Sequence, residues 1–143
     1  MQWSRIKSTF ESLLAEKLQG RLRVHVTEYT KAPMDIGRGW ITLDGTEIVS
    51  VQVPSFYDNS IYFEAEAIDF GAAIGFYVGM PFDEIRAARE PIIQGLAFLD
   101  RRMGKRHLKA VDVGTLHEFA NIIYQTRCKV EGLKPNESTE RAS

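Results

Sequence analysis

The residues best suited to chemistry are concentrated in one short basic segment, residues 101–109. Five of the eighteen Lys and Arg residues fall within these nine positions. Side chains of this kind bind phosphates and carboxylates, and each phosphate contact makes the affinity more dependent on salt. We therefore predict an anion-binding surface for a phosphate, a nucleic acid or an acidic protein. The predicted surface consists of Arg101, Arg102, Lys105, Arg106 and His107.

A second pair of cations could extend this surface from another part of the chain. Arg21 and Arg23 alternate with the apolar residues Leu22, Val24 and Val26. This alternation is typical of a strand with one apolar face and one polar face. If the basic face of the strand adjoins residues 101–109, Arg21 and Arg23 belong to the same anion-binding surface.

The same cations also have a purely structural interpretation. The apolar pattern from Ile92 to Met103 predicts a helix that Gly104 ends, and cations at the C-terminus of a helix stabilise it by roughly 0.3–1 kcal/mol each. Asp100 could pair with a neighbouring arginine. Further partners are available in the acidic segment, residues 39–85, which has eight Asp and Glu and no Lys or Arg, although the net charge of the chain is only −1. The binding function depends on whether folding neutralises the basic segment.

An enzymatic alternative rests on carboxylates within the acidic segment. Asp58, Glu64, Glu66 and Asp69 lie close together in the sequence. Clustered carboxylates opposite the basic segment would suit a small hydrolase, and this alternative predicts a concave pocket in which their pKa values are shifted. An acidic run more often forms the solvated face of a helix.

Two phosphate-related motifs are not supported. Gly104 does not complete a nucleotide-binding loop, because Leu99 stands where that motif needs glycine and Arg106 replaces the required Ser or Thr. The chain also has helix–turn–helix spacing, but the second helix would open with Asp83 and Glu84. Two carboxylates at the tip of a recognition helix would be repelled by DNA phosphates.

Metal and nucleophile chemistry are not indicated either. His25, His107 and His117 are far apart and do not form a local metal-ligand pair. Cys128 is the single cysteine, so the chain has no internal disulfide and no Cys-x-x-Cys motif. We therefore predict no metal and no cofactor, and we expect a cytoplasmic protein without a signal peptide or a membrane segment.

The elements that must position these residues begin with a helix and a hairpin. Apolar residues at three- and four-residue spacing predict a helix from Trp3 to Leu18, with Ser4 as its N-cap and Gly20 at its end. Asp44-Gly45 predicts a two-residue hairpin turn between strands at 39–43 and 46–53. Such a turn pairs Trp40 with Val49 and Ile41 with Ile48.

The rest of the chain is predicted to be helical. Helices are expected at about 66–78, at 82–89, from Pro91 to Met103 and at about 116–131, with connecting structure at 105–114. Thr115 and Glu118 have the spacing of a capping box for the last helix, which Gly132 should end.

These elements predict one α+β domain over residues 1–132, followed by a flexible C-terminal tail at 133–143. An N-terminal helix packs on a three-stranded antiparallel meander, and a C-terminal half of three to four helices follows. The residues alone predict a non-enzymatic binding or regulatory module that contacts an anionic partner.

Four stretches of the chain resemble a family of small bacterial proteins of unknown function. The stretches are Trp3–Lys7, the hairpin from Gly37 to Gly45, Asp100–Leu108 and Arg127–Gly132. The most specific is Asp100–Leu108, which reads Asp-Arg-Arg-x-Gly-Lys-Arg-x-Leu. Because the stretches reach both halves of the chain, the resemblance implies the whole domain. It implies no activity, cofactor or substrate, but it does imply that Asp100–Leu108 is a hallmark of the family.

Overall fold

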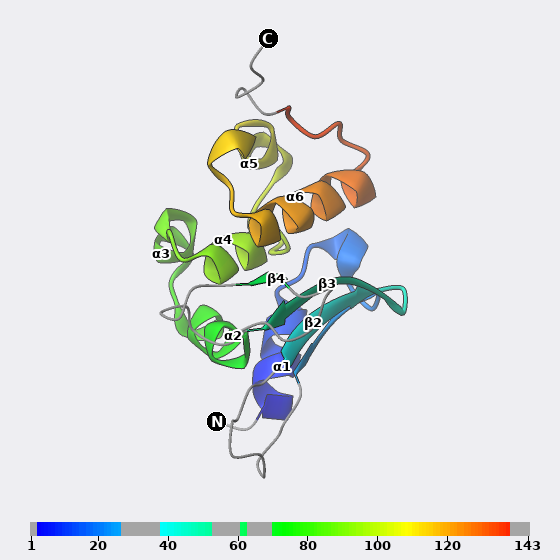
Figure 1. Cartoon of the computed structure of the whole chain (residues 1–143), viewed down its shortest axis with the longest axis vertical. Coiled ribbons are helices and arrows are strands. Elements are labelled where there is room, and N and C mark those ends of the chain that lie inside the picture. The colour runs from blue at the N-terminus through cyan, green and yellow to red at the C-terminus, as the bar shows by residue number, and fades with distance from the viewer. Residues whose placement is uncertain (1–2, 27–37, 53–60, 63–69, 138–143) are drawn as a thin grey trace.

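The structure is a computed structural model that describes residues 3–26, 38–52, 61–62 and 70–137 (Figure 1). Its N-terminal helix is shorter than predicted. Helix α1 spans Trp3–Ser12, and a separate 3-10 helix, η1, spans Glu16–Leu18. Between them the Ala15 amide donates to the Leu99 carbonyl at 2.8 Å. A helix continuing through residue 15 would need that amide for its own ladder, so this long-range bond ends α1. Ser4 lies inside the helix and does not cap it.

The sheet contains the predicted antiparallel meander. Strands β1 (Leu22–Val26), β2 (Arg38–Leu43) and β3 (Thr46–Gln52) pair in that order. Asp44 and Gly45 have φ values of 52° and 83°, which confirms the two-residue turn. A fourth strand, β4 (Ile61–Tyr62), runs parallel to β3 and was not anticipated from the sequence.

The register of the hairpin differs from the prediction because β3 contains a bulge. Thr42 pairs with Glu47, but Ile41 pairs with Val49, which leaves Ile48 as the extra residue. The shift places Ile41 opposite Val49, and both side chains are buried. In the predicted register Ile41 would face Ile48, which is only partly buried. Burial of the larger apolar set therefore favours the bulge.

The C-terminal half is helical, as predicted, but several of its boundaries are different. The described helices are α2 (Phe70–Gly79), α3 (Phe82–Ala87), α4 (Pro91–Ala97), α5 (Lys105–Lys109) and α6 (Glu118–Glu131), with a 3-10 turn, η2 (Val113–Thr115), before α6. Helix α4 ends at Ala97 and does not reach Met103. Gly104 is the N-cap of α5, in a region predicted to be connecting structure.

The long-range pairing that shortens α1 also explains the end of α4. The Arg101 amide donates to the Leu13 carbonyl at 2.8 Å, and Leu14 forms an isolated antiparallel bridge with Asp100. The main chain after α4 is thus extended against the residues that follow α1. As a result, the basic segment lies partly in a turn and partly at the start of α5, and not at the C-terminus of a long helix.

Helix α6 begins at Glu118, two residues later than predicted. His117 is its N-cap, and the His117 Nδ1 accepts a hydrogen bond from the Phe119 amide at 3.1 Å. Thr115 instead donates through its hydroxyl to the Asp112 carbonyl, so the predicted capping box does not form. Gly132 ends α6 with a φ of 71°, as predicted.

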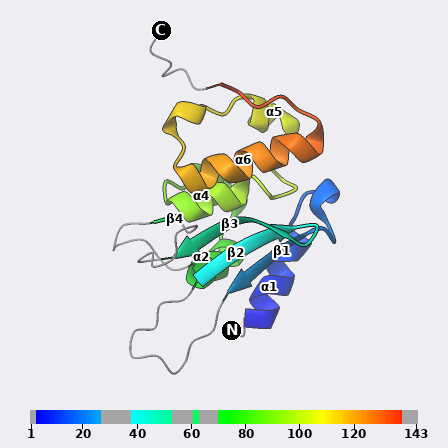
Figure 2. The ribbon, with the colours of Figure 1, turned by 45° about the vertical axis from the view of Figure 1, so that its right-hand side comes forward.

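The elements stack along the long axis of the molecule (Figures 1 and 2). Helices α1 and α2 cover one face of the sheet, α4 and α6 lie against each other beyond it, and α5 is at the far end. The contact between α4 and α6 requires a glycine: a Cβ on Gly95 would lie 2.5 Å from the Phe119 ring. One apolar core runs through all these elements, from Phe10 and Val24 to Leu108 and Tyr124.

Residues beyond α6 are held to the rest of the fold up to residue 137. The Asn136 side chain donates to the carbonyls of Lys109 and Val111, at 3.0 and 2.8 Å. The main-chain amide of Asn136 donates to the Tyr124 hydroxyl. The flexible tail predicted at 133–143 stays a prediction, because residues 138–143 lie outside the described part of the chain. None of the helices in that part has the length and apolar character needed to span a membrane.

Candidate anion-binding site

The centre of the basic segment is a buried carboxylate. The side chain of Asp100 is 0% exposed and accepts four hydrogen bonds. Three come from Arg102: its amide at 2.8 Å, its Nε at 2.9 Å and its Nη2 at 2.6 Å. The fourth comes from the Tyr77 hydroxyl at 2.7 Å. Asp100 thus ties the segment after α4 to helix α2.

The electrostatics of this cluster favour the ionised carboxylate. Burial by itself raises the pKa of Asp100, but the hydrogen bonds from Arg102 and Tyr77 outweigh it, and the pKa lies below its usual value. Burial and the adjacent carboxylate raise the pKa of Tyr77, so Tyr77 stays a donor. The Arg102 guanidinium also lies 4.8 Å from the centre of the Phe82 ring on α3. Arg102 was predicted to bind an external anion, but its guanidinium already has an internal one.

A second arginine, which sequence reasoning did not single out, holds the same segment from α6. Arg127 is only 3% exposed. Its Nη1 donates to the carbonyls of Phe98 and Asp100, at 2.9 and 3.1 Å, and its Nε donates to Glu131 at 2.9 Å. A cation on the inward face of a helix, four residues before a glutamate, was the available signal.

Three of the other cations of the basic segment belong to the predicted anion-binding surface and point to solvent. Arg101, Lys105 and Arg106 are exposed, and no acidic side chain forms an ion pair with them within the described residues. Arg101 is positioned by its main chain, which is bonded to Leu13. Lys105 and Arg106 lie on the first turn of α5, whose far end is bonded to Tyr124 and Asn136. We call Arg101, Lys105 and Arg106 the free cations.

The two β1 cations that were predicted to extend the anion-binding surface are already paired with acidic side chains of the protein itself. Arg21 makes a bidentate ion pair with Asp44, with bonds of 3.0 and 2.8 Å. Arg23 pairs with Glu11 at 3.0 Å. Burial raises the pKa of Glu11, but hydrogen bonds from Lys7, the main chain and Arg23 lower it below its usual value overall. Asp44, which belongs to the acidic segment, therefore neutralises Arg21. No described acid of residues 39–85 forms an ion pair with residues 101–109.

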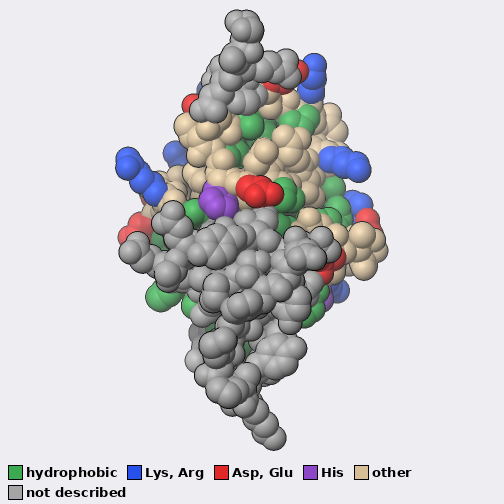
Figure 3. All heavy atoms as spheres, in the orientation of Figure 1, with side chains coloured by type: hydrophobic (Ala, Val, Ile, Leu, Met, Phe, Trp, Pro, Cys, Tyr) green, Lys and Arg blue, Asp and Glu red, His purple; other side chains and the backbone are tan. Residues whose placement is uncertain are grey.

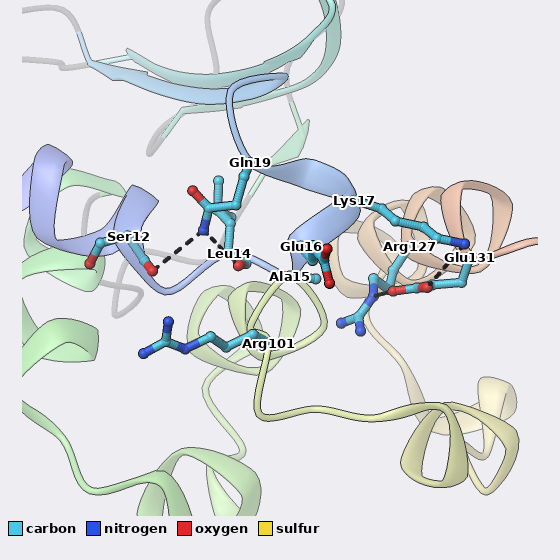
Figure 4. Close-up of a pocket in the computed structure, with 9 residues that line it drawn as sticks. All are labelled: Ser12, Leu14, Ala15, Glu16, Lys17, Gln19, Arg101, Arg127 and Glu131. Atoms are coloured by element: carbon cyan, nitrogen blue, oxygen red, sulfur yellow. Dashed lines mark hydrogen bonds and ion pairs between the residues drawn. The ribbon is translucent and has the colours of Figure 1, made fainter.

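Arg101 borders a groove that the sequence did not reveal. Figure 4 shows its guanidinium extending beneath Ser12 and Gln19, with no interaction to the other residues drawn. On the other side of the groove, Glu131 contacts Arg127 and lies 3.9 Å from the Lys17 ammonium. The groove has a volume of about 710 Å³. Its lining consists of Ser12, Leu14, Ala15, Glu16, Lys17, Gln19, Arg101, Arg127 and Glu131.

A shallower hollow connects this groove to Arg23. The hollow, of about 390 Å³, is lined by Arg23 and Glu11 among others and shares Ser12 and Gln19 with the groove. Arg101 lines the groove and Arg23 lines the hollow, and Arg23 is already paired with Glu11. Lys105 and Arg106 line neither depression. On the face shown in Figure 3, the described Lys and Arg side chains lie singly near the edges and do not gather into a patch.

The remaining sequence-based candidates have different outcomes. Asp58, Glu64, Glu66 and Asp69, the basis of the enzymatic alternative, lie outside the described residues. Burial raises the pKa of the Cys128 thiol, which disfavours the reactive thiolate. Within residues 3–26, 38–52 and 70–137, no three His, Cys, Asp or Glu side chains gather as metal ligands would.

Comparison with known protein families identifies the class of protein. The chain matches the SF0329 protein family over residues 2–66 and 61–128, which together include α1, the sheet, the helices α2 to α5 and most of α6. The chain belongs to this family, which is of uncharacterised type, in agreement with the resemblance drawn from its residues. No curated protein and no solved structure matches the chain.

Proposed function

We propose that this protein is a non-enzymatic binding or regulatory module that contacts an anionic partner through its free cations, Arg101, Lys105 and Arg106. One observation carries the proposal. Of the four cations in residues 101–106, only Arg102 has an ionic partner within the described residues. Cations in the interior of the fold are paired or hydrogen-bonded, so the unpaired ones are available to a ligand.

The free cations are held in place before any partner arrives. The Arg127 guanidinium holds the carbonyls of Phe98 and Asp100, and the Arg102 amide on the other side of Arg101 is bonded to the Asp100 carboxylate. Arg101 itself bonds to Leu13 through its main chain and keeps its side chain free. Less main-chain order must then be gained on binding, which reduces the entropic cost of association.

The proposed partner carries phosphate or carboxylate groups, as a nucleic acid, a phosphorylated molecule or an acidic protein does. His107 lies on α5, the helix that carries Lys105 and Arg106, but it faces inward. We therefore place His107 outside this surface. We further propose a bacterial, cytoplasmic protein in which the Asp100–Leu108 stretch is the hallmark of the family. Asp100, Arg102 and Leu108 would then be its structural part, and the free cations its functional part.

The test is retention on heparin and on a short DNA duplex over a series of salt concentrations. The test variant carries Arg101→Ala, Lys105→Ala and Arg106→Ala. The control variant carries Arg5→Ala, Arg89→Ala and Lys129→Ala. These three control residues are also exposed and without an ion pair among the described residues, so both variants lose the same charge.

We expect the test variant to elute at clearly lower salt than the control variant. For DNA, each lost phosphate contact should reduce the slope of log K against log salt by about 0.9. Equal retention of the two variants would overturn the proposal, because the effect would then follow net charge and not the free cations. The unsubstituted protein could also elute early from both matrices, with no change in the test variant. That result would exclude polyanions as partners. An acidic protein surface would then be tested with the same pair of variants.

A further inference from the structure

The hairpin turn between β2 and β3 places a carboxyl group next to an unshielded main-chain amide. Asp44-Gly45 is the one Asp-Gly pair in the chain, and Asn-Gly does not occur. Glycine has no Cβ to shield its amide from the side chain of the preceding residue. The Asp44 side chain is 55% exposed, and a Cβ placed on Gly45 would meet nothing within 4 Å. Neither bulk nor burial therefore protects this peptide bond.

The reaction open to such a pair is isomerisation of the aspartate, which needs only water. The Gly45 nitrogen forms a bond to Cγ of the protonated Asp44 side chain, and the amide proton and the carboxyl hydroxyl leave together as water. Water then hydrolyses the cyclic succinimide at the bond between this nitrogen and the main-chain carbonyl carbon of Asp44. The product is isoaspartate, in which the main chain continues through Cγ. Because water is released and then taken up, neither the mass nor the oxidation state changes.

Arg21 opposes this reaction through the position and the charge of the carboxyl group. The Arg21 Nε and Nη2 donate to the two Asp44 carboxylate oxygens at 3.0 and 2.8 Å, so one guanidinium occupies both oxygens. The hydrogen bonds from Arg21 also lower the pKa of Asp44 below its usual value, which favours the ionised form. An ionised carboxylate reacts poorly, because its oxygen must first take up protons before it can leave as water.

The Arg21 guanidinium is held by contacts that do not depend on the Asp44 carboxylate. Its Nη1 donates to the Lys17 carbonyl of η1 at 3.1 Å. The Arg21 main-chain amide donates to the Leu18 carbonyl at 3.0 Å, and the Arg21 carbonyl accepts from the Asp44 amide at 2.9 Å. Arg21 is thus fixed beside the turn from both its main chain and its side chain.

We propose that Asp44 is a site of spontaneous isoaspartate formation and that Arg21 slows this modification in the folded protein. Isomerisation adds the Asp44 Cβ to the main chain of a turn whose two residues both have positive φ, so the modified chain does not retain this turn. The site includes none of the free cations. This proposal and the proposed function can therefore fail independently.

The experiment follows isoaspartate in the folded protein during storage at pH ~5, where a small fraction of an exposed carboxyl group is protonated. Endoproteinase Asp-N cleaves before aspartate and not before isoaspartate, so loss of cleavage between Leu43 and Asp44 measures the modification. The test variant is Arg21→Ala. The matched control is Arg23→Ala, which removes a neighbouring exposed arginine that pairs with Glu11. Circular dichroism establishes that each variant is folded, and a second sample of each protein is stored unfolded in concentrated urea.

We expect folded Arg21→Ala to isomerise at Asp44 about two to five times faster than the unsubstituted protein, since an exposed ion pair is formed for only part of the time. Folded Arg23→Ala should react at the unsubstituted rate. In urea all three proteins should react equally fast, because the guanidinium no longer holds the carboxylate.

Three results would overturn the proposal. Equal rates for folded Arg21→Ala and folded Arg23→Ala would mean that Arg21 has no specific effect. An unmodified Asp44 in folded Arg21→Ala, over a time in which the unfolded chain reacts, would mean that the turn itself prevents the reaction. A rate difference that persists in urea would assign the effect to the local sequence and not to the ion pair of the folded state.

Discussion

Replacing Asp100 by Asn tests whether the centre of the basic segment holds the fold together. Asn has nearly the same shape, so the substitution removes the negative charge and leaves no cavity. One amide oxygen can still accept the two Arg102 bonds now made to Oδ1. The amide nitrogen, however, would face the Tyr77 hydroxyl and the Arg102 Nη2, which are the two donors now bonded to Oδ2.

The magnitude follows from the loss of the bond to the Arg102 Nη2 and of the negative charge, since the Tyr77 hydroxyl can still accept from the amide nitrogen. A hydrogen bond that involves a charged group contributes about 1.5–3 kcal/mol, and breaking a buried ion pair costs about 3–5 kcal/mol. The Asp100 side chain is 0% exposed, but that of Arg102 is 36% exposed and can be rehydrated in the variant. We therefore expect a loss of about 3 kcal/mol. At about 2–4 °C per kcal/mol, Tm should fall by roughly 6–12 °C.

The assay is urea unfolding of the protein and of Asp100→Asn as a function of pH. Because folding lowers the pKa of Asp100, the carboxylate contributes its full stability above the pKa of an unfolded Asp, about 3.9. That contribution is lost as the pH falls through the still lower pKa of the folded state. The difference between the two proteins should be constant near pH ~7 and should shrink in this acidic range.

Two further variants make the result specific. Tyr77→Phe removes one of the four bonds to the Asp100 carboxylate and should cost about 1.5 kcal/mol. Asp83→Asn removes an exposed carboxylate without an ion pair in the described residues, and should change stability by less than about 0.5 kcal/mol. If Asp100→Asn were no more destabilising than Asp83→Asn, or if its effect did not depend on pH, the assignment of Asp100 as the internal partner of Arg102 would be refuted.

Three other perturbations have definite expected outcomes. Gly95→Ala should destabilise by about 2–3 kcal/mol in thermal unfolding, because the new Cβ would overlap the Phe119 ring between two packed helices; wild-type stability would show that this contact is loose. Arg127→Met should cost about 3 kcal/mol in urea unfolding, since it leaves two main-chain carbonyls and a glutamate without their donor, and a neutral result would mean that these groups find water. Arg21→Ala should leave stability nearly unchanged despite its bidentate bond to Asp44, because both side chains are exposed and their attraction is screened by water. A larger loss in the same urea assay would contradict the low value assigned to surface ion pairs.

Local patterns were enough to predict the elements whose ends depend on nearby residues. Asp44-Gly45 specified its turn because both residues must adopt positive φ. Pro91 and Gly132 marked the beginning of α4 and the end of α6 for similarly local reasons. The alternation around Arg23 predicted β1 because one face of that strand is buried in the core.

Predictions failed where main-chain groups find partners far away in the sequence. Helices α1 and α4 both end early because the chain around Leu14 pairs with the chain around Asp100. Apolar periodicity continues beyond both ends, so a window of neighbouring residues cannot detect the stop. The bulge at Ile48 has the same kind of cause, since it depends on which side chains the helices cover.

For the candidate site, the sequence by itself located the basic segment and indicated that its charges needed partners. Only the tertiary structure decided how those charges are divided. Arg102 is bonded to a carboxylate two residues away, while Arg101, between them in sequence, is left facing the groove. An ion pair depends on distance and burial in space, and composition and spacing along the chain determine neither.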